Sequence, residues 1–318
     1  MNILSQIGAN KNIFKPVIYG LSSTVLSEEE KSFFSRSGAV GFILFSRNIE
    51  NKEQLKKLTK SLRDIMQGEV LILIDQEGGR VCRMQQPSWP KYPAGKYFAD
   101  IYQQDSIKAK HLIYQNFQNI ANDLFEVGVN VNCAPVIDVL QPQTHQVIGD
   151  RAYGDDCHQV SDLSQEVCKA LLSRNVYPVI KHIPGHGRAL CDSHLELPKV
   201  SCSIEDLRRV DFRPFIDLNQ QKFAMTAHIL YDAIDCENCA TTSSKVINLI
   251  RDEIGFKNIL MSDDISMKAL KGGLAEKTKQ ILQAGCDLVL HCNGNMNEMQ
   301  EIDKNLPLNS DELRLKFS

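Results

Sequence analysis

Two short stretches of the chain combine residue types that can carry out nucleophilic attack and proton transfer. The first contains Asp263 and Asp264, which directly follow an apolar run. A carboxylate at the end of a buried strand can attack an electrophilic carbon and form an ester with it. Because neighbouring residues on a strand point to opposite sides, we expect only one of the two carboxylates to face a site. The other is expected to be a supporting or helix-capping group.

The second stretch contains Asp192 and His194, two residues apart in a loop rich in Gly and Pro. In extended backbone their side chains project to the same side, so the carboxylate can hydrogen-bond the imidazole and fix its tautomer. A His has a pKa close to the working pH, which suits it to give and take a proton. The alternative is that the pair only pins the loop. A nucleophile and a proton donor together are what cleavage of a glycosidic bond requires.

Other polar and charged side chains follow further apolar runs of the chain. Any one of them, taken alone, is best interpreted as a solvated loop charge. A whole set at the ends of several strands is not explained in that way, because active sites of α/β barrels form where the strands end. The set includes Asp75, Arg83, Arg151, Lys181 and His182.

The segments that must position these residues alternate between apolar runs and helical patterns. The runs are near-continuously apolar, as is typical of parallel strands covered on both faces. Between them, apolar residues recur at helical spacing, as in Leu55, Leu58, Leu62 and Ile65, and Ser27 with Glu30 predicts a capping box. Eight runs predict a closed TIM (β/α)8 barrel, of fold class α/β. The predicted strands are Val17–Gly20, Val40–Phe45, Val70–Asp75, Val129–Ala134, Val179–His182, Phe223–Ala227, Ile259–Ser262 and Leu288–His291.

The length of 318 residues fits one such barrel, so we expect a single domain over 1–318 with a short polar tail from about 303, either a terminal helix or a frayed end. The 36 Lys and Arg against 39 Asp and Glu form no basic stripe, which argues against nucleic acid or membrane as a partner. The N-terminal segment does not resemble a secretory signal, so we expect a cytoplasmic protein with reduced cysteines. Cys236 and Cys239 have no second ligand pair at finger-like spacing, so no zinc site is expected there.

Four motifs of the chain resemble glycoside hydrolase family 3, and more narrowly its bacterial β-N-acetylglucosaminidases of peptidoglycan recycling. The resemblance runs in order from about Val17 to Asn293. The motifs are DQEGGR at 75–80, KHIPGHG at 181–187, DSH at 192–194 and SDDISM at 262–267.

This resemblance implies a retaining exo-β-N-acetylglucosaminidase that needs no cofactor or metal and works as a monomer. Its substrate would be N-acetylglucosamine joined to 1,6-anhydro-N-acetylmuramic acid, with or without peptide. Asp263 would be the nucleophile, and His194, assisted by Asp192, the general acid and base. The positions that match the family's sugar-binding residues are Asp75, Arg83, Arg151, Lys181 and His182.

Several alternatives stay open at this point. Some members of the family transfer the sugar to phosphate rather than to water. A metal-dependent barrel hydrolase would use histidines of the same loops together with Asp263, but such barrels usually begin with a His pair after the first strand, and none follows here. A catalytically silent sugar-binding protein would normally have lost one of the catalytic residues. The individual roles of His186, His228 and Trp89 are not decided by the sequence.

Overall fold

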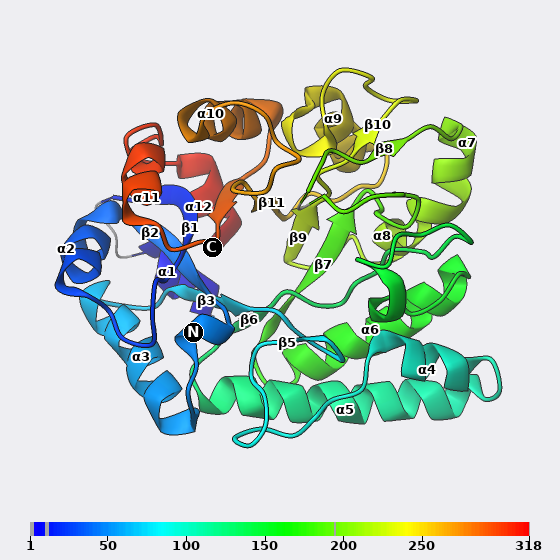
Figure 1. Ribbon diagram of the computed structural model, residues 1–318, viewed down its shortest axis with the longest axis horizontal. Helices are drawn as coiled ribbons and strands as arrows, with labels where there is room; N and C mark the ends of the chain where they lie inside the picture. Colours follow the sequence, from blue (N-terminus) through cyan, green and yellow to red (C-terminus); the bar gives the residue numbers. More distant parts are fainter. Residues whose placement is uncertain (1–2, 10–12, 194, 318) are drawn as a thin grey trace.

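The computed structural model of the chain describes residues 3–9, 13–193 and 195–317. Eight parallel strands close into a barrel in the order β1-β12-β11-β9-β7-β6-β3-β2 (Figure 1). All eight predicted strands and the predicted fold class are confirmed. The strands are β1 (Lys15–Gly20), β2 (Ala39–Leu44), β3 (Leu71–Ile74), β6 (Val131–Asn132), β7 (Tyr177–Ile183), β9 (Phe223–Thr226), β11 (Ile259–Asp264) and β12 (Leu288–His291).

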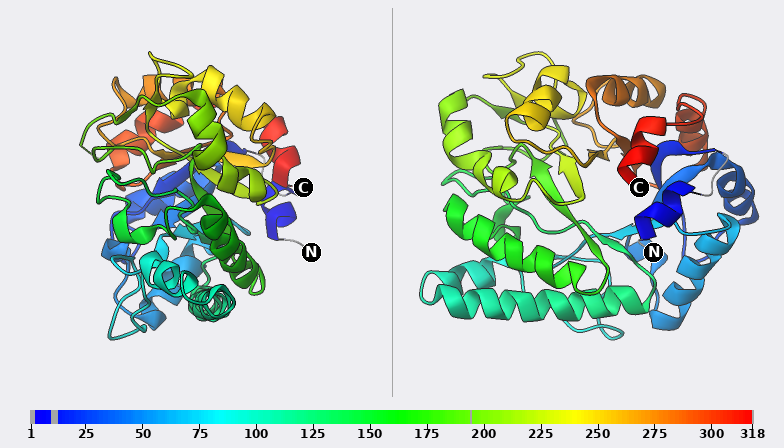
Figure 2. Two further views of the ribbon diagram at one scale, coloured as in Figure 1. Left: turned by 90° about the vertical axis from the view of Figure 1, so that its right-hand side faces the viewer. Right: turned by 180° about the vertical axis from the view of Figure 1, so that it is seen from behind.

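Helices surround the barrel on its outer face, as the three views of Figures 1 and 2 show. The capping box predicted at Ser27 is present: its hydroxyl accepts from the Glu30 backbone N–H, and the Glu30 carboxylate accepts from the Ser27 N–H. The helices are α1 (Ile3–Ala9), α2 (Glu28–Ser37), α3 (Lys52–Ile65), α4 (Gly95–Tyr102), α5 (Ser106–Glu126), α6 (Cys157–Leu172), α7 (Ile204–Asp206), α8 (Arg213–Asp217), α9 (Ser244–Asp252), α10 (Leu274–Ala284), α11 (Met296–Asp303) and α12 (Asp311–Phe317).

Two buried layers explain why the strands are apolar at nearly every position. On β2, Phe42 and Leu44 join the layer between the sheet and the helices, whereas Val40 and Ile43 join the layer inside the barrel. All six residues of β2 are buried. A strand covered on both faces has no solvated side, so the polar–apolar alternation of a half-buried strand is missing.

Strand β6 is shorter than the predicted run over 129–134, because asparagine side chains replace part of its backbone ladder. The Asn130 side chain accepts from the Ile72 N–H at 2.7 Å and donates to the Val70 carbonyl at 2.8 Å. The Asn132 side chain makes the same pair of bonds with the backbone of Gln76, at 3.0 Å each. These bonds hold the chain in place where regular pairing with β3 ends.

The amino-terminal end of the barrel is closed by α1 and α12. Phe317 of α12 packs edge-on against Phe14 and Phe223, with ring centroids 5.6 and 6.4 Å apart. Leu313 is buried in the same cluster. The polar tail therefore contains a packed helix. Among the described helices, none has the length and apolar character that crossing a membrane would require.

Short strands outside the barrel shape the loops at its carboxyl end. After β3, β4 (Gln76–Gly78) and β5 (Val81–Cys82) form an antiparallel hairpin. Farther along, β8 (Lys199–Val200) pairs with β10 (Leu230–Tyr231). Gly78 has a φ of +93°, and a Cβ there would lie 2.2 Å from the Pro93 carbonyl oxygen, so only glycine fits this turn.

Candidate active site

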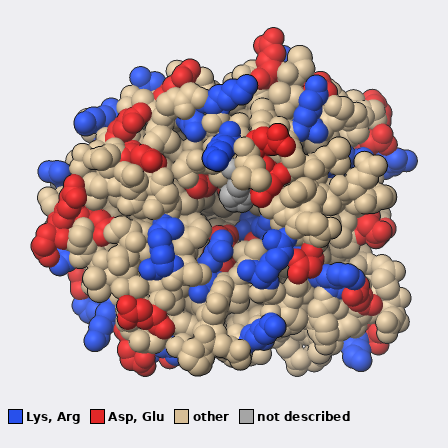
Figure 3. All heavy atoms as spheres, viewed as in Figure 1, with Lys and Arg blue, Asp and Glu red and all other residues tan. Residues whose placement is uncertain are grey.

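A cavity of about 530 Å³ opens at the carboxyl end of the barrel strands. Figure 3 shows it as a hollow near the middle of the face, with Lys and Arg side chains around its edge. Six of the eight residues expected in the site line this one cavity, although they are scattered over the sequence. They are Asp75, Arg83, Arg151, Lys181, His182 and Asp263.

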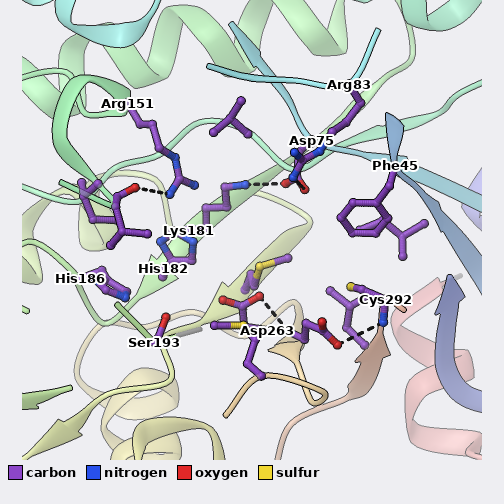
Figure 4. Close-up of a pocket in the computed structure, with 18 of the residues that line it drawn as sticks. Phe45, Asp75, Arg83, Arg151, Lys181, His182, His186, Ser193, Asp263 and Cys292 are labelled. Atoms are coloured by element: carbon purple, nitrogen blue, oxygen red, sulfur yellow. Dashed lines mark hydrogen bonds and ion pairs between the residues drawn. The ribbon is translucent and has the colours of Figure 1, made fainter. Parts of the chain in front are cut away.

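A row of alternating charges crosses one wall of the cavity. The ammonium group of Lys181, which is 3% exposed, lies 2.8 Å from Asp75 Oδ1 and 2.7 Å from Glu77 Oε1 (Figure 4). The second carboxylate oxygen of Asp75 accepts from Arg83 at 3.0 Å. Beyond Glu77, both carboxylate oxygens accept from Arg151, at 2.8 Å each. Each buried charge in the row therefore has a partner of opposite sign, which burial demands.

This pairing decides the ionisation of the wall. Burial alone would raise the pKa of Glu77, but Arg151 and Lys181 outweigh it and lower the pKa to about 2. The same balance of burial against Lys181 and Arg83 holds the pKa of Asp75 below its ordinary value. Burial would lower the pKa of Lys181, yet its two carboxylate partners raise it. All these groups are charged at neutral pH, so the wall presents fixed donors and acceptors.

The Gln76 side chain explains why Arg83 lies beside Asp75. Its carbonyl oxygen accepts from the backbone N–H groups of Arg83 and Met84 at 2.9 and 3.0 Å, and its amide donates to the Met84 carbonyl. Gln76 is fully buried. It thus ties the chain after the β4–β5 hairpin back to the end of β3.

His182 and His186 are held by one carboxylate that sequence reasoning did not single out. Asp138, fully buried, lies with its Oδ2 2.8 Å from His182 Nδ1. Its Oδ1 accepts from the backbone N–H groups of His182 and His186 at 3.1 and 2.7 Å. His186 also lines the cavity, and burial lowers its pKa to about 4, so its imidazole is neutral at pH 7.

Asp263 lines the cavity across from Lys181 (Figure 4). Burial alone would raise its pKa, but His228, His182, the Asp264 N–H and Lys181 together bring it below its ordinary value. Within the described residues, the Asp263 carboxylate accepts from the Asp264 N–H, which lies 2.8 Å from Oδ1. An ionised carboxylate with so few short bonds keeps oxygen lone pairs for a ligand.

Asp264 also borders the cavity, contrary to the expectation that only one of the two carboxylates would. The register of β11 against β12 shifts between Met261 and Asp264, which breaks the regular alternation of side chains. The Asp264 oxygens are nevertheless occupied: they accept from the Ser266 N–H and hydroxyl and from the Cys292 N–H. Asp264 therefore supports the loop, as expected of the second carboxylate.

The expected acid–base pair is placed only in part. His194 lies outside the described residues. Asp192 is half-buried in the loop after β7 and is not among the residues that line the cavity, whereas its neighbour Ser193 is. The Ser193 carbonyl accepts from the Ala269 N–H at 3.3 Å, which ties this loop to the segment after β11.

Two of the three residues whose roles were left open, Trp89 and His228, lie in the interior. Trp89 is 3% exposed and belongs to the main core rather than to the cavity lining. His228 is buried, with Nδ1 2.7 Å from the Thr241 hydroxyl and Nε2 3.1 Å from the Asp264 carbonyl oxygen. It therefore anchors the end of β11 from below. Across the described ranges, no three His, Cys, Asp or Glu side chains are gathered as metal ligands.

Comparison with known proteins agrees with this geometry. The N-terminal domain of glycosyl hydrolase family 3 matches residues 14–315. The chain belongs to this family. A β-hexosaminidase of Alkalilimnicola ehrlichii is 35% identical over 282 residues, which are 87% of this chain and 80% of that protein. A β-hexosaminidase of Neisseria meningitidis serogroup C is 33% identical over 283 residues, which are 87% and 78% of the two chains.

Solved structures show the same likeness. NagZ of Neisseria gonorrhoeae, in complex with N-trifluoroacetyl-D-glucosamine, superposes with a TM-score of 0.89 at 30% identity, over 96% of this chain and 89% of that one. A family 3 β-N-acetylglucosaminidase from a Paenibacillus species gives a TM-score of 0.87 at 28% identity, over 100% of this chain and 61% of that one. The family 3 chain described here is thus a glycoside hydrolase of the β-hexosaminidase class.

Proposed function

We propose that the chain is a retaining exo-β-N-acetylglucosaminidase with Asp263 as its nucleophile. The observation that carries the proposal is the place of Asp263: an ionised carboxylate that lines the cavity across from a row of paired charges. A carboxylate that faces a bound sugar can attack its anomeric carbon. The likeness to β-hexosaminidases supports an amino sugar as the group transferred.

The reaction proceeds in two displacements. In the first, an Asp263 oxygen forms a bond to the anomeric carbon, the bond from that carbon to the leaving oxygen breaks, and His194 gives its proton to the leaving oxygen. In the second, water attacks the same carbon, its proton passes to His194, and the ester to Asp263 breaks. Two inversions restore the original configuration, so the enzyme is retaining. Asp192 orients the imidazole of His194 and favours its charged form.

The charged wall holds the terminal sugar by its hydroxyl groups. Asp75 accepts from hydroxyls, while Lys181, Arg83 and Arg151 donate to hydroxyl oxygens. His182, fixed through Nδ1 by its carboxylate partner, turns its other ring nitrogen to the ligand. Hydrogen-bond donors and acceptors gathered on one wall can bind the several free hydroxyl groups of a sugar at the end of a chain. We therefore propose exo rather than endo action.

The proposed natural substrate is N-acetylglucosamine β-1,4-linked to 1,6-anhydro-N-acetylmuramic acid, with or without its peptide, as a product of peptidoglycan breakdown. Support for it comes from the four sequence motifs and from the NagZ neighbour, whose bound ligand is an N-acylated glucosamine. No cofactor or metal takes part in the proposed steps.

One experiment with synthetic substrates tests the proposal. The protein is incubated with p-nitrophenyl β-N-acetylglucosaminide and with the matching β-glucoside, each with and without inorganic phosphate, and the sugar products are identified. We expect rapid release of N-acetylglucosamine in the β configuration and slow reaction of the glucoside. A sugar 1-phosphate formed in the phosphate arm would make the protein a phosphorylase instead. Hydrolysis with inversion at the anomeric carbon would contradict Asp263 as nucleophile.

A further inference from the structure

Arg80, in the turn of the β4–β5 hairpin, is fastened to a segment far from it in the sequence. Its Nε donates to Asp150 at 2.8 Å. Its Nη2 reaches three successive carbonyl oxygens, those of Gln146, Val147 and Ile148. The fork of the guanidinium thus joins the loop after β3 to the loop after β6, and no role in the proposed reaction explains this contact.

The segment that Arg80 holds is a wall of the cavity. Val147 and Ile148 both line it, as does Arg80. Ile148 packs only into a small cluster with Val136 and Ala152, separate from the two large layers of the barrel. A segment whose buried apolar residues belong to such a small cluster depends on its polar tethers to keep its place.

This wall lies at the end of the cavity where the leaving group must depart. In Figure 4, Ser193 and His186 lie on one side of Asp263, whereas Phe45 and Cys292 lie on the other. The same wall segment is bonded to the loop that carries Ser193: the Thr144 hydroxyl donates to the Gly187 carbonyl, and the His145 N–H donates to the Ala189 carbonyl. A leaving oxygen that takes its proton from that loop must lie beside it.

We propose that Arg80 is a positioning residue for a leaving-group subsite, whose wall is formed by Val147 and Ile148. The proposal rests on the proposed function, because it takes the Asp192–Ser193 loop as the side of the leaving group. The two apolar side chains suit the face of a second sugar ring. Arg80 acts through the backbone carbonyls that it holds, rather than by contact with the ligand.

Binding measurements on a variant that cannot turn over test this role. The parent is the Asp263→Asn protein, and the ligands are N-acetylglucosamine and the β-1,4-linked disaccharide of N-acetylglucosamine, titrated by calorimetry. Adding Arg80→Met is expected to raise the Kd of the disaccharide about tenfold, because the wall that contacts its second sugar is displaced. The Kd of the monosaccharide should rise less than about twofold. Equal weakening of both ligands, or of neither, would overturn the proposal.

Two further variants separate positioning from other effects. Asp150→Asn keeps Arg80 but weakens the bond that holds its guanidinium. It should therefore also raise the Kd of the disaccharide, by less than Arg80→Met does. If it has no effect while Arg80→Met does, Arg80 contacts the ligand directly and the proposal is wrong. Arg208→Met is the matched control, since Arg208 is 50% exposed and bound to Glu253 by two bonds, against 45% for Arg80. Arg208→Met should leave the Kd of both ligands unchanged.

The same titrations distinguish failure of this inference from failure of the proposed function. If the Asp263→Asn parent binds neither ligand, while β-glucose binds, the amino-sugar function fails and the subsite falls with it. If the parent binds N-acetylglucosamine and Arg80→Met changes the affinity for both ligands by the same factor, only the inference about Arg80 fails.

Discussion

Asp138 holds His182 by two contacts: one carboxylate oxygen lies 2.8 Å from His182 Nδ1, and the other accepts from the His182 backbone N–H and also from that of His186. A carboxylate next to Nδ1 keeps a proton on that nitrogen. Nε2 is then the nitrogen that meets a ligand. The geometry therefore fixes both the direction of the ring and the hydrogen-bonding character of the nitrogen that is left for a ligand in the cavity.

Replacement of Asp138 by Asn should reverse that character with little change in shape. The amide oxygen can still accept from the two backbone N–H groups, but the amide NH₂ now donates to Nδ1 and drives the proton to Nε2. We expect kcat/KM for p-nitrophenyl β-N-acetylglucosaminide to fall about 10- to 100-fold, as for other changes to groups that orient a ligand-binding His. Asp100→Asn, at an exposed ion pair with Lys96, is the control. An unchanged kcat/KM would show that the position of the proton on the His182 ring does not matter.

Glu77→Gln should destabilise the protein because it removes the negative charge between Lys181 and Arg151. Both cations stay buried, and the loss of one partner of a buried ion pair typically costs about 3–5 kcal/mol. Urea unfolding measures the free energy of unfolding directly. Glu28→Gln, at an exposed pair with Lys31, should change it by less than about 1 kcal/mol. A Glu77→Gln protein as stable as the parent would contradict the account of the wall.

The depressed pKa values of Asp75 and Glu77 predict a loss of stability in acid. A carboxylate whose pKa is lower in the folded than in the unfolded state contributes stability above the unfolded value, and this is lost as the pH falls through the folded value. With about 4.3 for an unfolded Glu and about 2 for folded Glu77, the loss should fall between about pH 4.5 and 2. Unfolding midpoints measured across that range test it. A Glu77→Gln variant with an equally steep pH dependence would argue against a contribution from Glu77.

The loss of rate caused by removing the proposed proton donor should depend on the leaving group. His194→Ala should slow hydrolysis of a natural disaccharide about 10²- to 10⁴-fold, which is the usual contribution of general acid catalysis. It should slow hydrolysis of p-nitrophenyl glycosides much less, because nitrophenolate can leave almost without taking up a proton. Asp192→Ala should show the same trend more weakly, since it removes only the orienting carboxylate. The measurement is the ratio of the two rates for each variant. Equal losses on both substrates would mean that His194 holds the site together and delivers no proton.

Much of this architecture could be predicted from the sequence because it depends on local patterns. Apolar runs between helical patterns indicated all eight strands, and the resemblance to the family indicated six residues that share one cavity. Local pattern could not give the ends of β6, where the Asn130 and Asn132 side chains replace backbone bonds. The alternation rule was wrong for Asp264, because a register shift at the end of β11 overrides it.

The partners of the charged residues were also beyond local reasoning. Arg151 was expected to bind a sugar, and this stays a prediction. No local pattern indicated its bidentate bond to Glu77, which joins residues 74 positions apart. Asp138 was not singled out by the sequence patterns, and nothing near it in the sequence signals its bonds to His182. The general rule that buried charges need partners would have prompted a search for them. It would not have said which carboxylate pairs with which cation.

The most direct test of the central claim is to trap the intermediate on its nucleophile. A fluorinated N-acetylglucosaminide that forms the ester quickly and loses it slowly is mixed with the protein, and the labelled peptide is identified by mass spectrometry. We predict one label per chain, on Asp263, and no label in the Asp263→Asn variant, whose turnover should be lower by about 10³-fold or more. A label on Asp264 or Glu77, or a label that persists in Asp263→Asn, would contradict the account.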